Sequence, residues 1–152
     1  NIGELSGRFP GSTLADTIWP VSLSDGTTDL FIRQDRFHQQ FAADVDVDEA
    51  TLLAATQRPL RDVALNEGSG TPAWKKLPSW FIFGDFDRNI PAEAHRFMAE
   101  RAGSHETVEM LGVSHAIGVS QPDAVADIIL RAARETAAMT REPLVVQFAS
   151  FD

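Results

Sequence analysis

The sequence predicts an α/β protein in which a helical segment precedes a βαβα unit with parallel strands. A continuous apolar run over residues 79–83 is typical of a parallel strand that is covered on both faces. A second β-prone run follows at 107–111, and a helix-forming segment comes after each run. This alternation is the order of a βαβ unit, which places its two strands in parallel.

The first half of the chain is expected to form turns and short helices. Glycine and proline interrupt residues 1–34, which we expect to be turns with one short extended piece at 28–32. Phe37 and Phe41 recur at helical spacing, and similar patterns follow. Helices are expected at 35–44, 48–57 and 60–65, and Asp35 is the expected cap of the first. Short helices of this kind suit a lid better than a sheet, so residues 1–76 are interpreted as a lid or cap region.

The second half is expected to form the sheet and its covering helices. A helix over 92–102 should join the two strands, beginning after Pro91, a residue that the first turn of a helix tolerates. A long helix with one apolar face is expected over 122–139. The sheet unit is expected to span residues 77–140. Residues 141–152 are expected to form a tail, either as an edge strand or as a poorly ordered segment.

Composition narrows the classes of partner. The formal net charge of −9 disfavours binding to nucleic acid and to anionic membrane surfaces. No apolar stretch reaches the roughly 18–20 residues of a membrane span, and the first residues lack the pattern of a signal peptide. The absence of cysteine excludes disulfides and thiolate chemistry. We therefore expect a cytoplasmic protein that acts on a small molecule.

The loops after the two strands carry the candidate catalytic residues. Two parallel strands place the loops at their carboxyl ends on the same edge of the sheet, where α/β proteins bind their ligands. The first loop holds Asp85 and Asp87, and the second holds His115. We expect Asp87 and His115 to come within hydrogen-bonding reach. A carboxylate that accepts from one imidazole nitrogen fixes the tautomer of a general base.

Alternatives remain for both side chains. Asp85 is the rival acid if the loop is shifted, although it suits a solvated loop carboxylate, and His115 could instead cap a strand end. A calcium loop is excluded because Ile90 and Arg96 stand where that motif requires glycine and glutamate. A phosphatase with an aspartyl nucleophile, of the haloacid-dehalogenase type, is disfavoured because no acidic pair for magnesium follows. The histidine spacings predict no metal site.

Two stretches resemble the α/β-hydrolase family. Residues 80–91, with the sequence WFIFGDFDRNIP, look like the strand and G-x-x-D-x-x-x-P loop that deliver the acid of that family. Residues 112–115, GVSH, look like the G-x-S-H that delivers its histidine, and the order of the two motifs also matches. Residues 25–32 and 36–44 resemble the lid of an esterase-like subgroup. The resemblance covers about residues 8–135.

The resemblance implies a partial α/β-hydrolase fold and a serine-hydrolase-type esterase that acts on a small ester or acyl substrate without a cofactor. It assigns the acid to Asp87 and the histidine to His115. The nucleophile of the family lies in G-x-S-x-G upstream of the lid, and no such pentapeptide occurs here. Gly68-Ser69-Gly70 follows no strand. We therefore expect the nucleophile to lie outside this chain, and the chain alone to be inactive.

An incomplete sheet has a structural consequence. Two or three strands would leave the edge of the first strand bare and part of the long helix exposed, and such surfaces mark interfaces. We expect the chain to pair with a missing N-terminal half or with a second copy. The competing hypothesis is a catalytically inactive fragment or interaction module that folds by pairing with another chain.

Side chains of the lid are candidates for contact with substrate. These candidates are Phe31, Phe37, His38 and Phe41. A place in the lid core is favoured over the pocket wall for the three aromatic residues, and for His38 a hydrogen bond to a neighbour is favoured over contact with substrate. His95 and His105 are expected at the surface.

Overall fold

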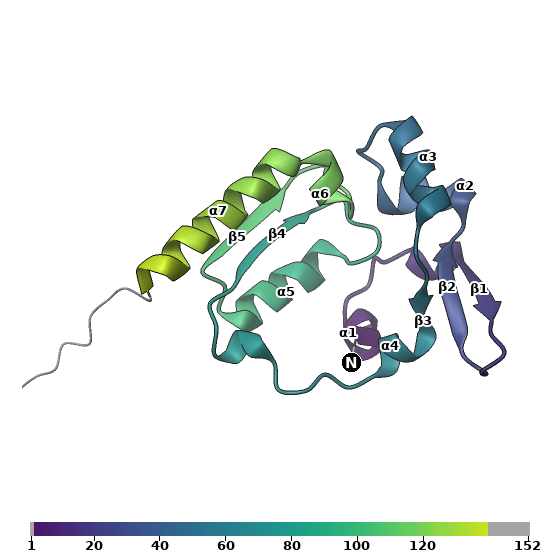
Figure 1. Cartoon of the computed structure of the whole chain (residues 1–152), viewed down its shortest axis with the longest axis horizontal. Helices are drawn as coiled ribbons and strands as arrows, with labels where there is room; N and C mark the ends of the chain where they lie inside the picture. The colour runs from purple at the N-terminus through teal and green to yellow at the C-terminus, as the bar shows by residue number, and fades with distance from the viewer. Residues whose placement is uncertain (1, 140–152) are drawn as a thin grey trace, which may run out of the picture.

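The computed structural model describes residues 2–139, which form an N-terminal part and a C-terminal part side by side (Figure 1). The N-terminal part contains α1 (Ile2–Arg8), the 3-10 turn η1 (Leu14–Thr17), β1 (Ile18–Ser22), β2 (Thr28–Ile32), α2 (Gln34–Phe41), α3 (Val47–Thr56), β3 (Leu60–Arg61), α4 (Asp62–Asn66) and the 3-10 turn η2 (Ala73–Lys75). The C-terminal part contains β4 (Trp80–Gly84), α5 (Ala92–Ala102), β5 (Glu106–Met110), α6 (Ile117–Ser120) and α7 (Pro122–Met139).

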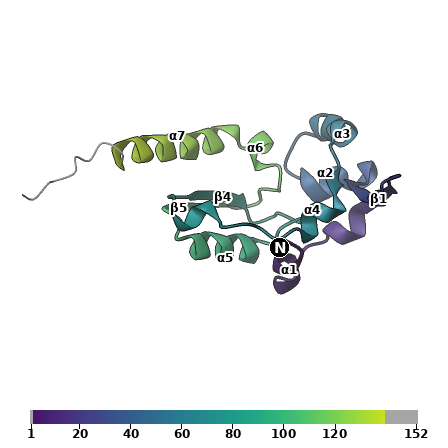
Figure 2. The same ribbon diagram turned by 60° about the horizontal axis from the view of Figure 1, so that its bottom comes forward.

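The C-terminal part is the predicted βαβα unit. Strands β4 and β5 pair in parallel, from Trp80 opposite Glu106 to Gly84 opposite Met110. Helices α5 and α7 cover opposite faces of this pair, with α7 above the strands and α5 below them in Figure 2. Helix α5 ends at Gly103, whose φ of +59° is the left-handed conformation that commonly closes a helix. Both helices have the bounds that the sequence predicts.

The N-terminal part differs from its prediction because it contains a sheet. Strands β1 and β2 form an antiparallel hairpin, and the short β3 pairs with the other side of β2. Residues 18–22 were expected to be turns on account of Pro20. That strand lies at the edge of the sheet, where a residue without an N–H is tolerated. Helix α1 was also not expected.

The helices of the N-terminal part follow the predicted pattern with one correction. Helix α2 starts at Gln34, and Arg33 occupies the N-cap position without a side-chain hydrogen bond. Asp35 therefore lies in the first turn and is not the cap. Helix α3 is capped by Asp46, whose carboxylate accepts from the backbone amide of Asp48 at 2.9 Å. The short helix expected at 60–65 is replaced by β3 and then α4.

A hydrophobic cluster joins the N-terminal part to the loop that carries His115. Its members are buried apolar side chains from β2, α2, the α2–α3 connection and α3, with one residue from the loop after β5. They are Ile32, Phe37, Ala42, Val45, Ala50, Ala54 and Ala116. Because Ala116 directly follows His115, the packing of the N-terminal part fixes one end of the candidate catalytic loop.

Apolar side chains also remain exposed on the C-terminal part. Ile129 and Leu130 of α7 are more than half exposed, and Leu111 after β5 is 84% exposed. Within residues 2–139, β4 pairs with β5 alone, so its other edge carries no strand. No helix in this range has the length and apolar character that crossing a membrane requires. The tail predicted at 141–152 lies outside the described residues.

Candidate active site

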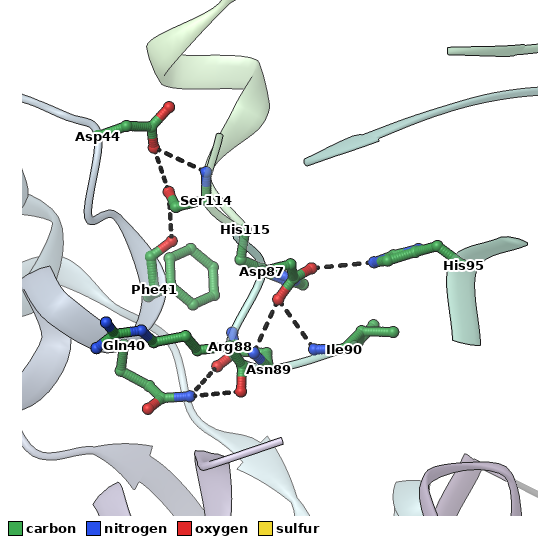
Figure 3. Close-up of polar contacts among 10 residues, drawn as sticks. All are labelled: Gln40, Phe41, Asp44, Asp87, Arg88, Asn89, Ile90, His95, Ser114 and His115. Atoms are coloured by element: carbon green, nitrogen blue, oxygen red, sulfur yellow. Dashed lines mark hydrogen bonds and ion pairs between the residues drawn. The ribbon is translucent and has the colours of Figure 1, made fainter. Parts of the chain in front are cut away.

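Asp87 lies in the loop between β4 and α5 and is almost completely buried, with 3% of its side chain exposed. Its Oδ1 accepts hydrogen bonds from the backbone amides of Asn89 at 2.8 Å and Ile90 at 2.9 Å. These two bonds fix the carboxylate within its own loop. Its Oδ2 is thereby directed toward the imidazole side chains of the site (Figure 3).

His115 lies in the loop after β5, and its Nδ1 is 2.7 Å from Oδ2 of Asp87. The predicted proximity of these two side chains is therefore confirmed, although their catalytic roles stay predictions. The His115 side chain remains 29% exposed, and the ring of Phe41 meets it edge-on at 4.7 Å between centroids. The rival acid Asp85 instead accepts from the backbone amide of Gly112 at 2.6 Å.

The end of β4 touches the His115 loop directly. The backbone amide of Phe86 donates to the carbonyl of Val113 at 3.1 Å. A Cβ atom at Gly84 would lie 2.5 Å from the carbonyl carbon of Val113 and closer still to its oxygen. Glycine is therefore required just before the acid loop (residues 85–91, between β4 and α5), because it lets this loop meet the loop that carries His115.

His95 of α5 is a second imidazole at the site. Its Nε2 lies 3.0 Å from Oδ2 of Asp87, the same oxygen that faces His115. The expectation that His95 lies at the surface is wrong, since 15% of its side chain is exposed. Helix α5 begins immediately after the acid loop, so its first turns lie at the same sheet edge as Asp87. His105, in contrast, is exposed as expected.

The surroundings of Asp87 favour its ionised form. Burial raises the pKa of this carboxyl, but hydrogen bonds from His115 and His95, the charge of His115 and the Ile90 amide hold the pKa well below its ordinary value of 3.8. Asp87 is thus a buried carboxylate that only accepts hydrogen bonds. Both imidazole nitrogens that face it must therefore donate.

Gln40 of α2 connects the N-terminal part to the acid loop. Its amide nitrogen donates to the carbonyl of Arg88 and to Oδ1 of Asn89, both at 2.9 Å. Its amide oxygen accepts from the hydroxyl of Thr13 at 2.8 Å. Gln40 is buried, so these bonds satisfy a polar group that would otherwise destabilise the core.

Asp44, just beyond α2, connects the N-terminal part to the His115 loop. Its Oδ1 accepts from the hydroxyl of Ser114 and from the Ser114 backbone amide, the latter at 3.0 Å. The carbonyl of Phe41 accepts from the Ala116 amide at 3.0 Å and lies 3.3 Å from the hydroxyl oxygen of Ser114. Burial raises the pKa of Asp44, but the bonds from Ser114 lower it overall. Figure 3 shows the contacts of Ser114 with Asp44 and with the Phe41 carbonyl.

Sequence reasoning missed Gln40, Asp44 and His95 as members of this site. Phe37, Gln40, Phe41 and Asp44 recur at intervals of three and four residues. A polar side chain within such an apolar stripe is a signal of buried hydrogen bonding. For His95, the available signal is its place near the start of a helix that follows the acid loop.

A family model described as the alpha/beta hydrolase family matches residues 4–128, which is most of the chain. This chain belongs to the α/β-hydrolase family. The prediction of a partial α/β-hydrolase fold with a parallel βαβα unit is confirmed.

Solved esterase structures share the fold. The crystal structure of polyneuridine aldehyde esterase matches this chain with a TM-score of 0.68 and 17% sequence identity. The matched region covers 86% of the present chain and 54% of the esterase chain. A mutant of that esterase, with alanine in place of one histidine, has a TM-score of 0.66 and 16% identity, with coverages of 85% and 53%. The present chain thus spans about half the length of these structures. No curated protein matches it significantly.

The lid residues predicted to meet substrate occupy different environments in this α/β-hydrolase chain. Phe41 alone among them contacts the His115 ring. Phe37 is buried behind it in the hydrophobic cluster. His38 is hydrogen-bonded through Nε2 to the carbonyl of Val45 at 3.0 Å, which is the structural role favoured from sequence. The ring of Phe31 packs against Trp19 in the hairpin.

Within residues 2–139, no hydroxyl group is hydrogen-bonded to Nε2 of His115. The nearest serine in sequence, Ser114, is fully buried and its hydroxyl donates to Asp44. Ser114 thus holds the loop that carries His115 against the N-terminal part through its hydrogen bond to Asp44. The described residues also contain no group of three or more histidine, aspartate or glutamate side chains arranged to hold a metal ion.

Proposed function

We propose that this chain supplies the acid and the base of a serine-hydrolase-type active site, with Asp87 as the acid and His115 as the base. The observation that carries the proposal is the 2.7 Å contact between Asp87 Oδ2 and His115 Nδ1, on a histidine that stays partly exposed. Family membership supports the same assignment.

The chemistry follows from the tautomer. Because Asp87 is an ionised acceptor, His115 carries its proton on Nδ1 and presents the lone pair of Nε2. That nitrogen can remove the proton of an attacking serine and later return it to the leaving group. Asp87 stabilises the imidazolium that forms in between. The serine and the oxyanion-stabilising amides would come from sequence outside this chain.

The substrate we propose is a small ester or similar acyl compound. The solved structures with the same fold are of an esterase, and the ring of Phe41 provides an apolar wall beside His115. A cavity of about 220 Å³ has Arg36, Gln40 and Arg88 in its wall, but His115 does not line it. The substrate pocket would therefore form between His115 and the segment that carries the nucleophile.

The segment that carries the nucleophile is also the partner we propose for the incomplete sheet. This segment would cover the edge of β4 that carries no strand within residues 2–139, together with the exposed side chains Ile129 and Leu130 of α7. A second copy of this chain is the alternative occupant. Sedimentation of the chain alone and with the segment encoded upstream of residue 1 distinguishes the two, because only a second copy yields a dimer without the added segment.

Hydrolysis of a p-nitrophenyl ester tests the proposal. The chain alone should show no activity above background. Co-expression with the segment encoded upstream of residue 1 should give turnover, and His115→Ala should reduce kcat by at least about 10³-fold because the general base is lost.

His105→Ala is the matched control, since His105 is an exposed histidine outside the Asp87 network. It should keep the activity of the parent complex. Equal activity in the His115→Ala complex and its parent would refute the proposed base. Turnover by the chain alone that His115→Ala abolishes would place the nucleophile within this sequence, contrary to the proposal.

A further inference from the structure

Asp87 is shared between two histidines that come from different elements. Besides His115, the side chain of His95 reaches Oδ2 of Asp87 from the first half of α5, at 3.0 Å (Figure 3). The His95 ring also stacks on Phe83 of β4, with the planes 11° apart and the centroids 4.8 Å apart. The ring is therefore held on its face by packing and at its edge by the carboxylate.

We propose that His95 is a positioning residue of this site, which donates an Nε2–H hydrogen bond to Asp87 and so keeps that carboxylate ionised and directed at His115. The catalytic meaning of this role rests on the function proposed above. The contact itself exists independently of the identity of the nucleophile or the substrate.

The proton arrangement follows from the number of acceptor positions. Asp87 receives four donors: the Asn89 and Ile90 amides on Oδ1, and the two imidazoles on Oδ2. Two donors on one oxygen compete for its charge. The bond from His95 therefore weakens the attraction between Asp87 and protonated His115.

The charged groups around His95 do not provide a different explanation. Asp87 and His115 face it from the two loops, and β4 presents the uncharged ring of Phe83. On α5 itself, Arg96 is paired with Glu109 of β5. Glu93 of α5 and Asp85 of the acid loop are near enough to Arg96 for their charges to raise its pKa. Asp87 is the only carboxylate with a hydrogen bond to His95 among residues 2–139.

Histidine NMR titration of the full chain tests the proposal with two substitutions. His95→Phe keeps an aromatic ring on Phe83 but removes the donor, so the titration midpoint of His115 should rise relative to that of the parent chain. His95→Gln places an uncharged amide N–H at the position of Nε2, so the midpoint should stay close to that of the parent chain. Exposed His105 serves as the internal reference, and its midpoint should not change.

Two results would overturn the proposal. One is an unchanged His115 midpoint in the His95→Phe chain, and the other is an equal shift in the phenylalanine and glutamine chains. Thermal unfolding of each variant shows that its fold is retained, and the glutamine chain supplies the comparison if the phenylalanine chain does not fold. The titration requires no turnover, so failure of the esterase assay alone would leave this result intact.

Discussion

Replacement of Gly84 by alanine should separate the two loops of the candidate site. The added Cβ would lie 2.5 Å from the carbonyl carbon and 2.9 Å from the Cβ of Val113, where ordinary contacts begin at 3.4 Å. The overlap is largest at the carbonyl oxygen of Val113, and its relief requires the two backbone segments to separate by more than about 1 Å. No flexible side-chain end is available to absorb it.

The expected loss of stability can be estimated from two contributions. Overpacking at a close backbone contact costs about 1–3 kcal/mol. Loss of the hydrogen bond from the Phe86 amide to the Val113 carbonyl adds about 0.5–1.5 kcal/mol. Gly84→Ala should therefore reduce the free energy of unfolding by about 1.5–4.5 kcal/mol. Urea denaturation followed by circular dichroism measures this difference.

Gly118→Ala is the matched control. Gly118 lies in α6, and a Cβ atom added there would have no neighbour within 4 Å. Alanine at this helical position should leave stability unchanged or increase it by up to about 1 kcal/mol. A Gly84→Ala chain as stable as the Gly118→Ala chain would refute the close contact between the acid loop and the His115 loop.

Three further substitution effects follow from the hydrogen bonds of the site. Asp87→Ala should destabilise the fold by about 3–5 kcal/mol because two amides and two imidazoles lose their acceptor. Asp87→Asn should cost only about 1–3 kcal/mol because it keeps an oxygen facing the amides. Equal urea midpoints for the two variants would contradict this difference. Because the folded-state pKa of Asp87 lies below its ordinary 3.8, its contribution to stability is complete above about pH 5 and declines as pH falls below about 4. The stability difference between the parent chain and Asp87→Asn should shrink on acidification, and a widening gap would refute the assignment. Gln40→Ala should reduce the free energy of unfolding by about 2–3 kcal/mol because its hydrogen-bonding partners are left unpaired. The control Gln39→Ala, at an exposed position, should change this free energy by less than about 0.5 kcal/mol. Similar thermal shifts for both variants would show that Gln40 does not stabilise the contact between α2 and the acid loop.

The sequence predicts the C-terminal part well because there the local signals agree. The apolar run before Gly84 and the helix break at Gly103 identify β4 and the end of α5, and parallel pairing then brings Asp87 and His115 to one edge. The N-terminal part is harder to predict because its hairpin depends on long-range pairing. Pro20 argues against a strand until the neighbouring strand shows that it lies at an edge.

The rest of the candidate site depends on tertiary contacts that no local pattern encodes. His95 is one of several polar residues on α5, and only the approach of the acid loop makes it a neighbour of Asp87. Asp44 and Ser114 are 70 residues apart, and their bond depends on how the two parts pack. Phe37 and His38 belong to the same helix as Phe41, but only Phe41 faces the His115 ring.

The tautomer of His115 tests the central claim most directly, because it reports whether Asp87 and His115 form an acid–base pair in solution. In a chain with nitrogen-15-labelled histidine, at a pH where His115 is neutral, the pair predicts a proton on Nδ1 and a lone pair on Nε2. Asp87→Ala should remove that preference. A neutral His115 protonated on Nε2 in the parent chain, or the same Nδ1–H form in the alanine chain, would contradict the account.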